Sequence, residues 1–350
     1  MSWFTRYMSE RGMTRIAVIA TGGTIASTAT EGGVVATRTA AAVLEGAVFG
    51  DIEVETHDLM TVGSYRMTLG HLRSISDAVD ALLRRSHDPV DGIVITHGTD
   101  TMEETAILLD LVHDDERPVV LTGAQRAGDA LDGDGPRNLA DAVLAAAAPQ
   151  CRGLGVLIVF AGRVLPARAT RKVHTTALDA FRSAACGTVG TVSDGTVTVD
   201  AVPRRPPPLP RPTSAFDGTR VDLLEMYPGA DDVLIAAAVS AGARGIVLAG
   251  TGIGNANPVV VTAIRGLVGT DVAVVLSTRV PEGPVRGVYG DGGGADLVAA
   301  GVPTASGLPA TQLRILLALW LSENKAEPDR VRSMIAACAD LADEEDNKEE

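Results

Sequence analysis

The sequence predicts an α/β fold with a large N-terminal domain and a smaller C-terminal α/β domain. Short apolar runs of strand length alternate with helical patterns through the first two thirds of the chain. This alternation is typical of a mostly parallel sheet that is covered by helices on both faces. A proline-rich stretch then interrupts the pattern, and a second series of strands and helices follows it.

The larger predicted domain covers residues 14–202. Its predicted strands are four apolar runs, at 15–20, 92–96, 118–122 and 154–160. Apolar residues at helical spacing predict helices between them, around 69–82, 101–113 and 138–147. Thr101 and Glu104 match the T-x-x-E pattern of a capping box, which would start the second of these helices.

The proline-rich stretch marks the predicted domain boundary. Residues 203–212 carry six prolines, which exclude a helix or a central strand, so 203–213 is predicted to be an extended linker. The smaller domain is predicted at 214–341. Its predicted strands and helices lie at 245–249, 258–267, 272–276 and 312–321. Disordered ends are expected at residues 1–13 and in the acidic tail, 342–350.

Composition and charge exclude several classes of protein. The formal net charge of −14 argues against a nucleic-acid-binding protein, which needs a cationic face to neutralise phosphates. No apolar run reaches the ~20 residues that span a bilayer, and the N-terminus lacks the apolar core of a signal peptide. Cys151, Cys186 and Cys338 are sparse and lack metal-ligand spacing, so they are interpreted as free thiols in the cytoplasm.

Two loops carry the residues most typical of chemistry. Thr21–Ala26 (TGGTIA) follows the first predicted strand, and Thr96–Glu104 (THGTDTMEE) follows a later one. Open α/β sheets bind their ligands at the carboxyl ends of parallel strands. In each loop a glycine allows a tight turn, and a threonine follows near a helix N-terminus, where backbone N–H groups can bind an anion.

Each loop has a structural interpretation as well. Glycine turns after strands are common, and threonine is a common N-cap. The pair of loops together leaves two functional interpretations about equally supported, catalysis and the binding of a small anion.

The loops also resemble the two signature segments of the bacterial-type L-asparaginase family. The matching strings are ATGGTIA (20–26) and ITHGTDTMEETA (95–106). Weaker similarity extends over about residues 14 to 340, through VGSY (62–65), TGAQR (122–126), DGPRNL (134–139), RATRKVHTT (168–176), AGTGIGN (249–255) and STRVPEG (277–283). The resemblance implies two α/β domains and a homotetramer, a dimer of tight dimers. Each active site would lie between the large domain and the small domain of a neighbouring subunit.

By this resemblance, Thr24 matches the family's nucleophilic threonine, and Thr99, Asp100 and Lys172 match a second catalytic triad. A threonine hydroxyl is a weak nucleophile and needs an adjacent base. Burial of the Lys172 amine near Thr99 would favour its neutral form, which can accept or relay a proton. A lone lysine is more often a solvated surface residue, and only its place in RATRKVHTT favours the catalytic role.

The resemblance also implies a set of substrate-binding residues. Ser64 would hold the substrate α-carboxylate, Asp100 would receive its α-ammonium group, and the Ala124 carbonyl would lie near the leaving amide. The other predicted contacts are Gly23, Gly63, Tyr65, Gly98, Thr99 and, from the partner subunit, Asn255. No metal is expected, because the histidines form no ligand cluster. No cofactor is expected either, and the glycine-rich string at 250–254 lacks the spacing and the later acidic residue of a dinucleotide-binding motif. His97 follows a buried strand and is predicted to have a structural role.

One departure from the family concerns the loop after TGGTIA. Similar proteins carry a tyrosine there that activates the nucleophile, but the loop at 27–39 has none, and the aligned position is about Val34. Tyr289, in the glycine-rich segment 287–294, is the predicted replacement. A loop tyrosine packed at the dimer interface is the equally supported alternative.

The predicted function is hydrolysis of L-asparagine to L-aspartate and ammonia through a threonine-bound acyl-enzyme, with L-glutamine as a slower substrate. One alternative is the amidohydrolase subunit of a tRNA-dependent amidotransferase. That subunit has an additional N-terminal domain, whereas only about 13 residues precede the first predicted strand here. The other alternative is a non-enzymatic sensor that binds aspartate without turnover.

Overall fold

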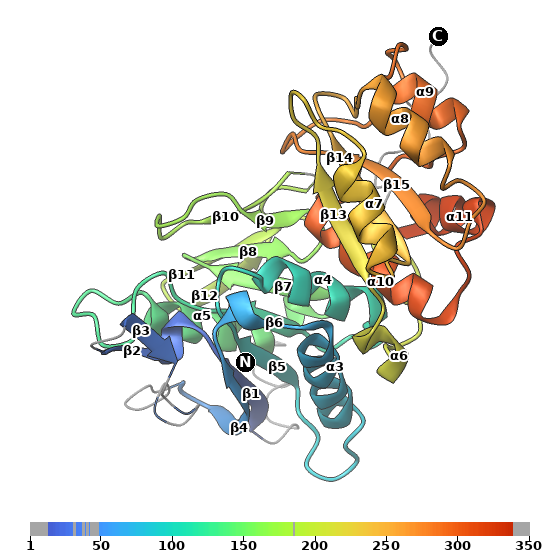
Figure 1. Cartoon of the computed structure of the whole chain (residues 1–350). Coiled ribbons are helices and arrows are strands. Elements are labelled where there is room, and N and C mark those ends of the chain that lie inside the picture. Colours follow the sequence, from blue (N-terminus) through green and yellow to red (C-terminus); the bar gives the residue numbers. More distant parts are fainter. Residues whose placement is uncertain are drawn as a thin grey trace. The chain divides into compact units, whose positions relative to one another are not determined.

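The computed structural model of the chain describes residues 13–30, 33–36, 39, 42, 49–184 and 186–338 (Figure 1). The chain divides into two compact units between Arg205 and Pro206. This division falls within the stretch for which a linker is predicted. The two segments predicted to be disordered lie outside the described residues, except for Met13.

The larger unit is built on an eight-stranded sheet with the order β12-β11-β8-β7-β6-β5-β1-β4. The five strands from β7 to β4 are parallel, and β8, β11 and β12 extend the sheet with antiparallel pairs. The strands are β1 (Thr14–Gly22), β4 (Ile52–Val62), β5 (Gly92–Thr96), β6 (Val119–Thr122), β7 (Val156–Phe160), β8 (Arg163–Pro166), β11 (Gly190–Ser193) and β12 (Thr196–Val199). The predicted mostly parallel sheet is therefore confirmed.

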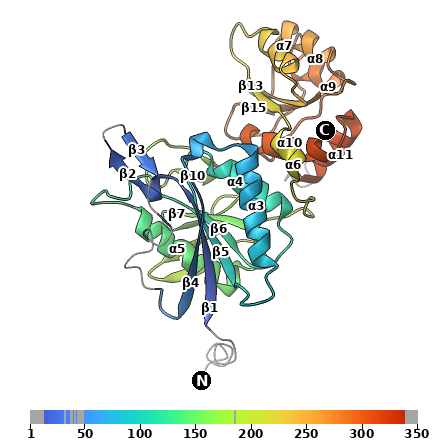
Figure 2. The ribbon, with the colours of Figure 1, turned by 60° about the horizontal axis from the view of Figure 1, so that its bottom comes forward.

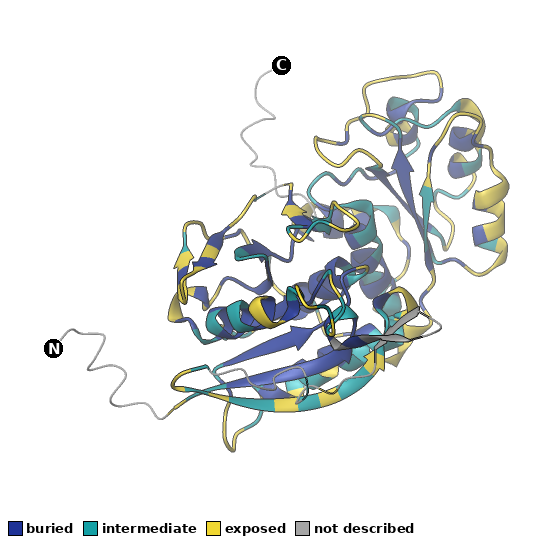
Figure 3. Cartoon of the chain, turned by 90° about the vertical axis from the view of Figure 1, so that its left-hand side faces the viewer, coloured by how far each residue is buried: buried dark blue, intermediate teal, exposed yellow. Residues whose placement is uncertain are grey.

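Helices cover both faces of this sheet. They are α3 (Leu69–Leu83) and α4 (Met102–Val112) on one face and α5 (Gly135–Ala147) on the other. Ile16 and Val18 of β1 pack in the core that contains α5, whereas Ala17 and Ile19 pack in the core that contains α3 and α4. Figure 2 shows α3 and α5 on opposite sides of the central strands. Since both faces are covered, β5 and β6 are buried along their whole length, as the dark blue strands of Figure 3 illustrate.

Several strands of the larger unit lack the continuous apolar run from which strands were predicted. The edge strand β4 mixes polar and apolar residues, and none of them is fully buried: Ile52 and Val54 pack at the edge of one core, and Leu59 and Met60 at the edge of the other. Two short hairpins are rich in small, polar or charged residues. They are β2 (Ser27–Thr30) with β3 (Gly33–Ala36), and β9 (Thr170–Lys172) with β10 (Phe181–Ser183).

The predicted capping box at the start of α4 is wrong. Thr101 is the N-cap residue of this helix, but its side chain makes no capping hydrogen bond. Its hydroxyl instead donates to the backbone carbonyl of Ser64, at 2.9 Å. The tertiary contact with a neighbouring loop therefore replaces the local cap that the sequence pattern suggests.

The smaller unit contains a parallel three-stranded sheet with the order β13-β14-β15. Alternate residues of β14 again serve two cores: Ile246 and Leu248 pack with α7 and α8, whereas Gly245 lies against Leu317 and Leu321 of α10. The elements are α6 (Ser214–Asp217), β13 (Val221–Glu225), α7 (Val233–Ser240), β14 (Gly245–Gly250), α8 (Pro258–Arg265), β15 (Ala273–Thr278), α9 (Gly294–Ala299), α10 (Ala310–Glu323) and α11 (Pro328–Cys338). Among the described residues, no helix is both long enough and apolar enough to cross a bilayer.

Candidate active site

Four neighbouring strands of the large sheet end at the same edge, and a predicted site residue follows each of them. Ser64 follows β4, Thr24 follows β1, Thr99 follows β5 and Ala124 follows β6. The strands β4, β1, β5 and β6 are parallel neighbours, so their carboxyl ends lie side by side. This edge of an open α/β sheet is where such folds bind ligands.

Glycines allow these loops to pack backbone against backbone. Gly23 has a φ of 79°, and a Cβ atom built on it would lie 2.3 Å from the backbone nitrogen of Gly98. A Cβ atom on Gly98 would in turn lie 2.5 Å from the Ser64 Oγ. No larger residue fits at either position, so the TGGT and HGTD motifs place Thr24, Thr99 and Ser64 in one compact group of loops.

Lys172 joins two residues of the loop after β5. Its Nζ donates to the Thr99 Oγ1 at 2.8 Å and to an Asp100 carboxylate oxygen at 2.9 Å. Thr99 is buried, and the Lys172 side chain is only 17% exposed, whereas the Asp100 side chain is 55% exposed. The structure therefore brings Lys172 to the two predicted residues Thr99 and Asp100, which lie 73 and 72 positions before it in the sequence. It also leaves the Asp100 carboxylate partly open to an incoming cation.

Two contacts hold the segment that carries Lys172 against helix α4. The backbone N–H of Lys172 donates to the buried Glu103 carboxylate at 2.7 Å. Arg168 and Asp110 form a buried ion pair with a distance of 2.8 Å. Sequence reasoning missed both contacts, although Glu103 lies in the HGTDTMEE motif. Because a buried carboxylate needs a partner, these contacts define the position of Lys172 relative to Thr99.

Ser64 connects the loop after β4 to the loop after β5. Its Oγ accepts a hydrogen bond from the backbone N–H of Asp100 at 3.2 Å, and its carbonyl accepts the Thr101 hydroxyl. The predicted neighbour Tyr65 is 74% exposed, and its ring lies close to Gly63. Ser64 and Asp100, the two residues predicted to recognise the substrate's charged groups, are therefore in direct contact.

Thr24 begins a short 3₁₀ turn, Thr24–Ala26, and is half-buried. The β2–β3 hairpin follows this turn directly, and Val34, where similar proteins were expected to carry the activating tyrosine, pairs with Ala29. Part of the predicted loop, 27–39, lies outside the described residues.

His97 is completely buried below the site and acts as a structural residue. Its Nδ1 lies 2.7 Å from the Gly98 carbonyl, which can only accept, so Nδ1 carries the proton. Its Nε2 then accepts the Thr105 hydroxyl at 2.9 Å. Burial lowers the pKa of His97 from 6.5 to about 4. The ring therefore stays neutral at pH 7 and holds the backbone of the HGTD loop, in agreement with its predicted role.

Asn255 and Tyr289 both belong to the smaller unit. The Asn255 side-chain oxygen accepts the backbone N–H of Gly294 at 3.0 Å, and its backbone forms an isolated bridge with Thr251. Tyr289 is 61% exposed, and its carbonyl accepts the backbone N–H of Ala295 at the start of α9. The predicted roles of both residues depend on a partner subunit or a movement and stay predictions.

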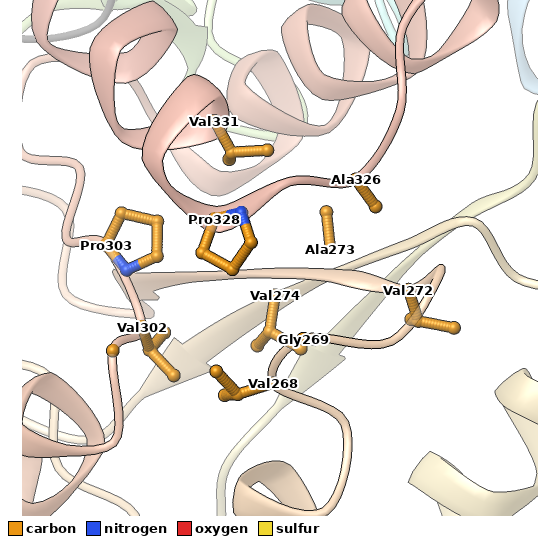
Figure 4. Close-up of a pocket in the computed structure, with 11 residues that line it drawn as sticks. Val268, Gly269, Val272, Ala273, Val274, Val302, Pro303, Ala326, Pro328 and Val331 are labelled. Carbon is orange, nitrogen blue, oxygen red and sulfur yellow. The ribbon is translucent and has the colours of Figure 1, made fainter.

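Two hollows among the described residues lie away from the predicted site residues. The first, in the smaller unit, has a volume of about 20 Å³ and is lined by small apolar residues such as Val274, Pro303 and Val331 (Figure 4). It is too small and too apolar for a polar substrate. The second has a volume of about 940 Å³ and includes Thr14 and Pro118 near the amino ends of the strands. Among the described residues, no group of three or more histidine, cysteine or acidic residues could hold a metal ion.

Comparisons with known proteins match both units. Residues 15–205 match the model "Asparaginase, N-terminal", and residues 220–335 match the model "Glutaminase/Asparaginase C-terminal domain". A protein of Deinococcus radiodurans named "Probable L-asparaginase" is 39% identical over 318 residues, which cover 90% of this chain and 95% of that protein.

Two further proteins extend the comparison. An L-asparaginase of Bacillus licheniformis is 34% identical over 321 residues, which cover 89% of this chain and 96% of that protein. The crystal structure of a probable cytoplasmic L-asparaginase from Campylobacter jejuni is similar with a TM-score of 0.80. It is 30% identical, and the match covers 93% of this chain and 99% of that one.

Proposed function

This chain belongs to the asparaginase family, and we propose that it hydrolyses L-asparagine to L-aspartate and ammonia with Thr24 as the nucleophile. The observation that carries the assignment of roles is the hydrogen-bonded set Lys172, Thr99 and Asp100 at the sheet edge where Thr24 also lies. A hydroxyl nucleophile needs a neighbouring group that can take its proton, and this set contains an amine that can do so.

The proposed reaction has two steps. The Thr24 oxygen attacks the side-chain amide carbon of asparagine, the carbon–nitrogen bond breaks, and ammonia leaves with a proton from the site. Water then attacks the resulting ester of Thr24 and releases L-aspartate, and the hydroxyl proton returns to Thr24. Thr99 and Lys172 take and return protons in both steps. Backbone N–H groups of the tightly packed loops stabilise the oxyanion that forms in each step.

The substrate is recognised by its two charged groups. Asp100 receives the α-ammonium group, and the Ser64 hydroxyl donates to the α-carboxylate. An amide without the α-ammonium group would leave the Asp100 charge without its partner when the site closes, which is costly. Succinamic acid should therefore be a very poor substrate. Equal kcat/KM values for succinamic acid and asparagine would contradict this assignment.

L-Glutamine is the slower second substrate. Its side chain is one methylene longer, and one methylene changes the free energy of the transition state by only ~1–3 kcal/mol. The site therefore disfavours glutamine without excluding it. Steady-state kinetics on the two amides measure the ratio directly.

Ammonia release from L-asparagine by the purified protein is the decisive experiment. Mass spectrometry of acid-quenched enzyme should also find an aspartyl group on the peptide that contains Thr24. A protein that binds aspartate but releases no ammonia would instead be the small-anion sensor. If the acyl group is found on a different residue, the proposed activity stands, but Thr24 is not the nucleophile.

The active form is proposed to be a cytoplasmic homotetramer in which Asn255 reaches the site of a partner subunit. Apolar side chains that are exposed in the single chain, such as Val233, Leu234 and Val259, support an interface on the smaller unit. The free cysteines Cys151, Cys186 and Cys338 support a reducing compartment. Analytical ultracentrifugation tests the assembly. The substitution Asn255→Ala should reduce activity and leave the tetramer unchanged.

A further inference from the structure

Gln125 contacts the catalytic set directly, although neither the sequence pattern nor the proposed mechanism gives it a role. It follows β6 after Gly123 and Ala124, and its side chain makes three hydrogen bonds. Its Oε1 lies 3.0 Å from the Thr99 Oγ1. Its Nε2 donates to the backbone carbonyls of Thr175 at 3.3 Å and Ala177 at 3.0 Å.

The orientation of this amide is fixed by its partners. The carbonyl oxygens of Thr175 and Ala177 can only accept, so the atom that faces them must be the amide nitrogen. A flipped amide would place Oε1 against two carbonyl oxygens and lose both bonds. Gln125 therefore presents a hydrogen-bond acceptor to Thr99.

This acceptor determines which group donates in each hydrogen bond of the Thr99 hydroxyl. A hydroxyl has one proton, and in Thr99 it is donated to the Gln125 oxygen. The Lys172 Nζ must then be the donor in its 2.8 Å contact with the Thr99 oxygen. The Gln125 contact thus sets the direction of the Thr99 hydroxyl hydrogen and leaves a lone pair of the Thr99 oxygen for the bond from Lys172.

The backbone of Gln125 is itself held firmly. The Asp134 carboxylate, at the N-cap of α5, accepts the backbone N–H groups of Gln125 and Arg126 at about 3 Å and also the Asn138 side chain. The backbone of Gln125 is thus held by the N-terminus of α5, and its side-chain amide is held by the segment after Lys172.

We propose that Gln125 is a positioning residue of the amide hydrolysis. It holds the Thr99 oxygen within hydrogen-bond distance of Lys172 in the resting site, and the Thr99 O–H turns from Gln125 to Lys172 when it relays a proton. This inference rests on the proposed function of Thr99 and Lys172. A displacement of a reacting group by about 1 Å can reduce a rate by 10²-fold, so the loss of one of the two contacts that hold the Thr99 oxygen should reduce kcat.

The substitution Gln125→Met tests the proposal because methionine has a similar length but can neither accept from Thr99 nor donate to the two carbonyls. We expect kcat for asparagine to fall about 10-fold, with KM changed less than twofold, because Gln125 acts on the chemical step and not on substrate binding. The matched control is Arg126→Met. This neighbouring side chain bonds to Asp132 at the surface, and its loss should leave kcat within twofold of the parent.

Coupling to Thr99 separates positioning from a general structural role. In a Thr99→Val background Gln125→Met should have no further effect on kcat, since the hydroxyl that it positions is gone. The inference is overturned if Gln125→Met keeps kcat within twofold of the parent, or if its effect is the same in both backgrounds.

The same four proteins also give a result that does not depend on activity. If Gln125 holds Thr99, the shifts in the urea midpoint caused by Gln125→Met and Thr99→Val should be non-additive, and additive shifts would overturn the inference. If the parent releases no ammonia from asparagine, the proposed function fails, and these midpoints still decide whether the two side chains are coupled.

Discussion

Two threonines follow neighbouring strands of the same sheet, and the structure holds them in different ways. Thr99, after β5, is buried and hydrogen-bonded by Lys172 on one side and Gln125 on the other. Thr24, after β1, is half-buried in a single 3₁₀ turn, directly before the β2–β3 hairpin. Both motifs consist of a glycine followed by a threonine, so the local sequence does not explain the difference.

The difference matches what each threonine is proposed to do. A nucleophile must be reached by the substrate, so it lies in a turn with one side open. A residue that relays protons must keep a fixed hydrogen-bond geometry, so it is enclosed by partners. The buried His97 ring also holds the loop of Thr99, through hydrogen bonds with the Gly98 carbonyl and the Thr105 hydroxyl.

Removal of the Thr24 hydroxyl should have the largest effect. Thr24→Ala should lower kcat at least ~10³-fold with the fold intact, because the covalent step is lost, which corresponds to about 4 kcal/mol of transition-state free energy. Thr24→Ser is the matched control and should keep part of the activity. Near-normal turnover of a folded Thr24→Ala protein would assign the nucleophile to another residue, with Thr99 as the first candidate.

The next effect concerns the enclosed threonine. Thr99→Val and Lys172→Met should each lower kcat by ~10²-fold or more, and the double variant should be little worse than either single one, because the two side chains form one hydrogen-bonded unit. Arg171→Met, which removes the adjacent cation, serves as the control. If the effects multiply, the two residues act independently and the idea of a fixed relay is wrong.

Tyr289 tests how the open threonine is activated. If its phenol exchanges a proton with Thr24 in the closed state, Tyr289→Phe should lower kcat by ~10²-fold, since it removes only the hydroxyl. Tyr227→Phe, a second partly exposed tyrosine of the smaller unit, should have no effect. If Tyr289→Phe is fully active, Tyr65 or an ordered water becomes the better candidate for exchanging a proton with Thr24.

The smallest effect on turnover, but a clear one on stability, is expected from His97. Its pKa is about 4 in the folded protein against 6.5 for the free side chain, so the unfolded chain binds more protons between these values. Stability should therefore fall as the pH drops from 6.5 to 4, by at most about 3 kcal/mol. Urea unfolding at several pH values should show that His97→Gln lacks this acid-dependent loss. A substitution of the exposed His87 should retain it.

Local patterns predicted the elements in which apolar residues form a continuous run or recur at helical spacing. The continuous apolar runs of β1, β5 and β6 identified them as strands buried on both faces, and helical spacing identified α3 and α5. The edge strand β4 and the hairpins β2–β3 and β9–β10 were missed. No residue of β4 is fully buried, and each hairpin strand has only three or four residues, which is too short for a periodic pattern to identify it.

The same distinction applies to the site. The motifs alone identified Thr24, Ser64, Thr99, Asp100 and Lys172 as candidates, because the TGGT and HGTD loops and the VGSY and RATRKVHTT segments resemble segments of a known family. Thr101 shows the limit of such patterns. Its motif predicts a helix cap, but its hydroxyl bonds to the Ser64 carbonyl, a partner that no local pattern contains.

By itself, therefore, the sequence determined the fold class and the family, and it supplied most of the candidate site residues, since these depend on hydrophobic periodicity and on short motifs. Only the tertiary structure decided which groups face one another. Gln125, Glu103 and the Arg168–Asp110 pair acquire their roles from contacts between segments that are 26 to 69 positions apart. The physical reason is that hydrogen bonds depend on distance and direction in space, which only the packing of helices on the sheet sets.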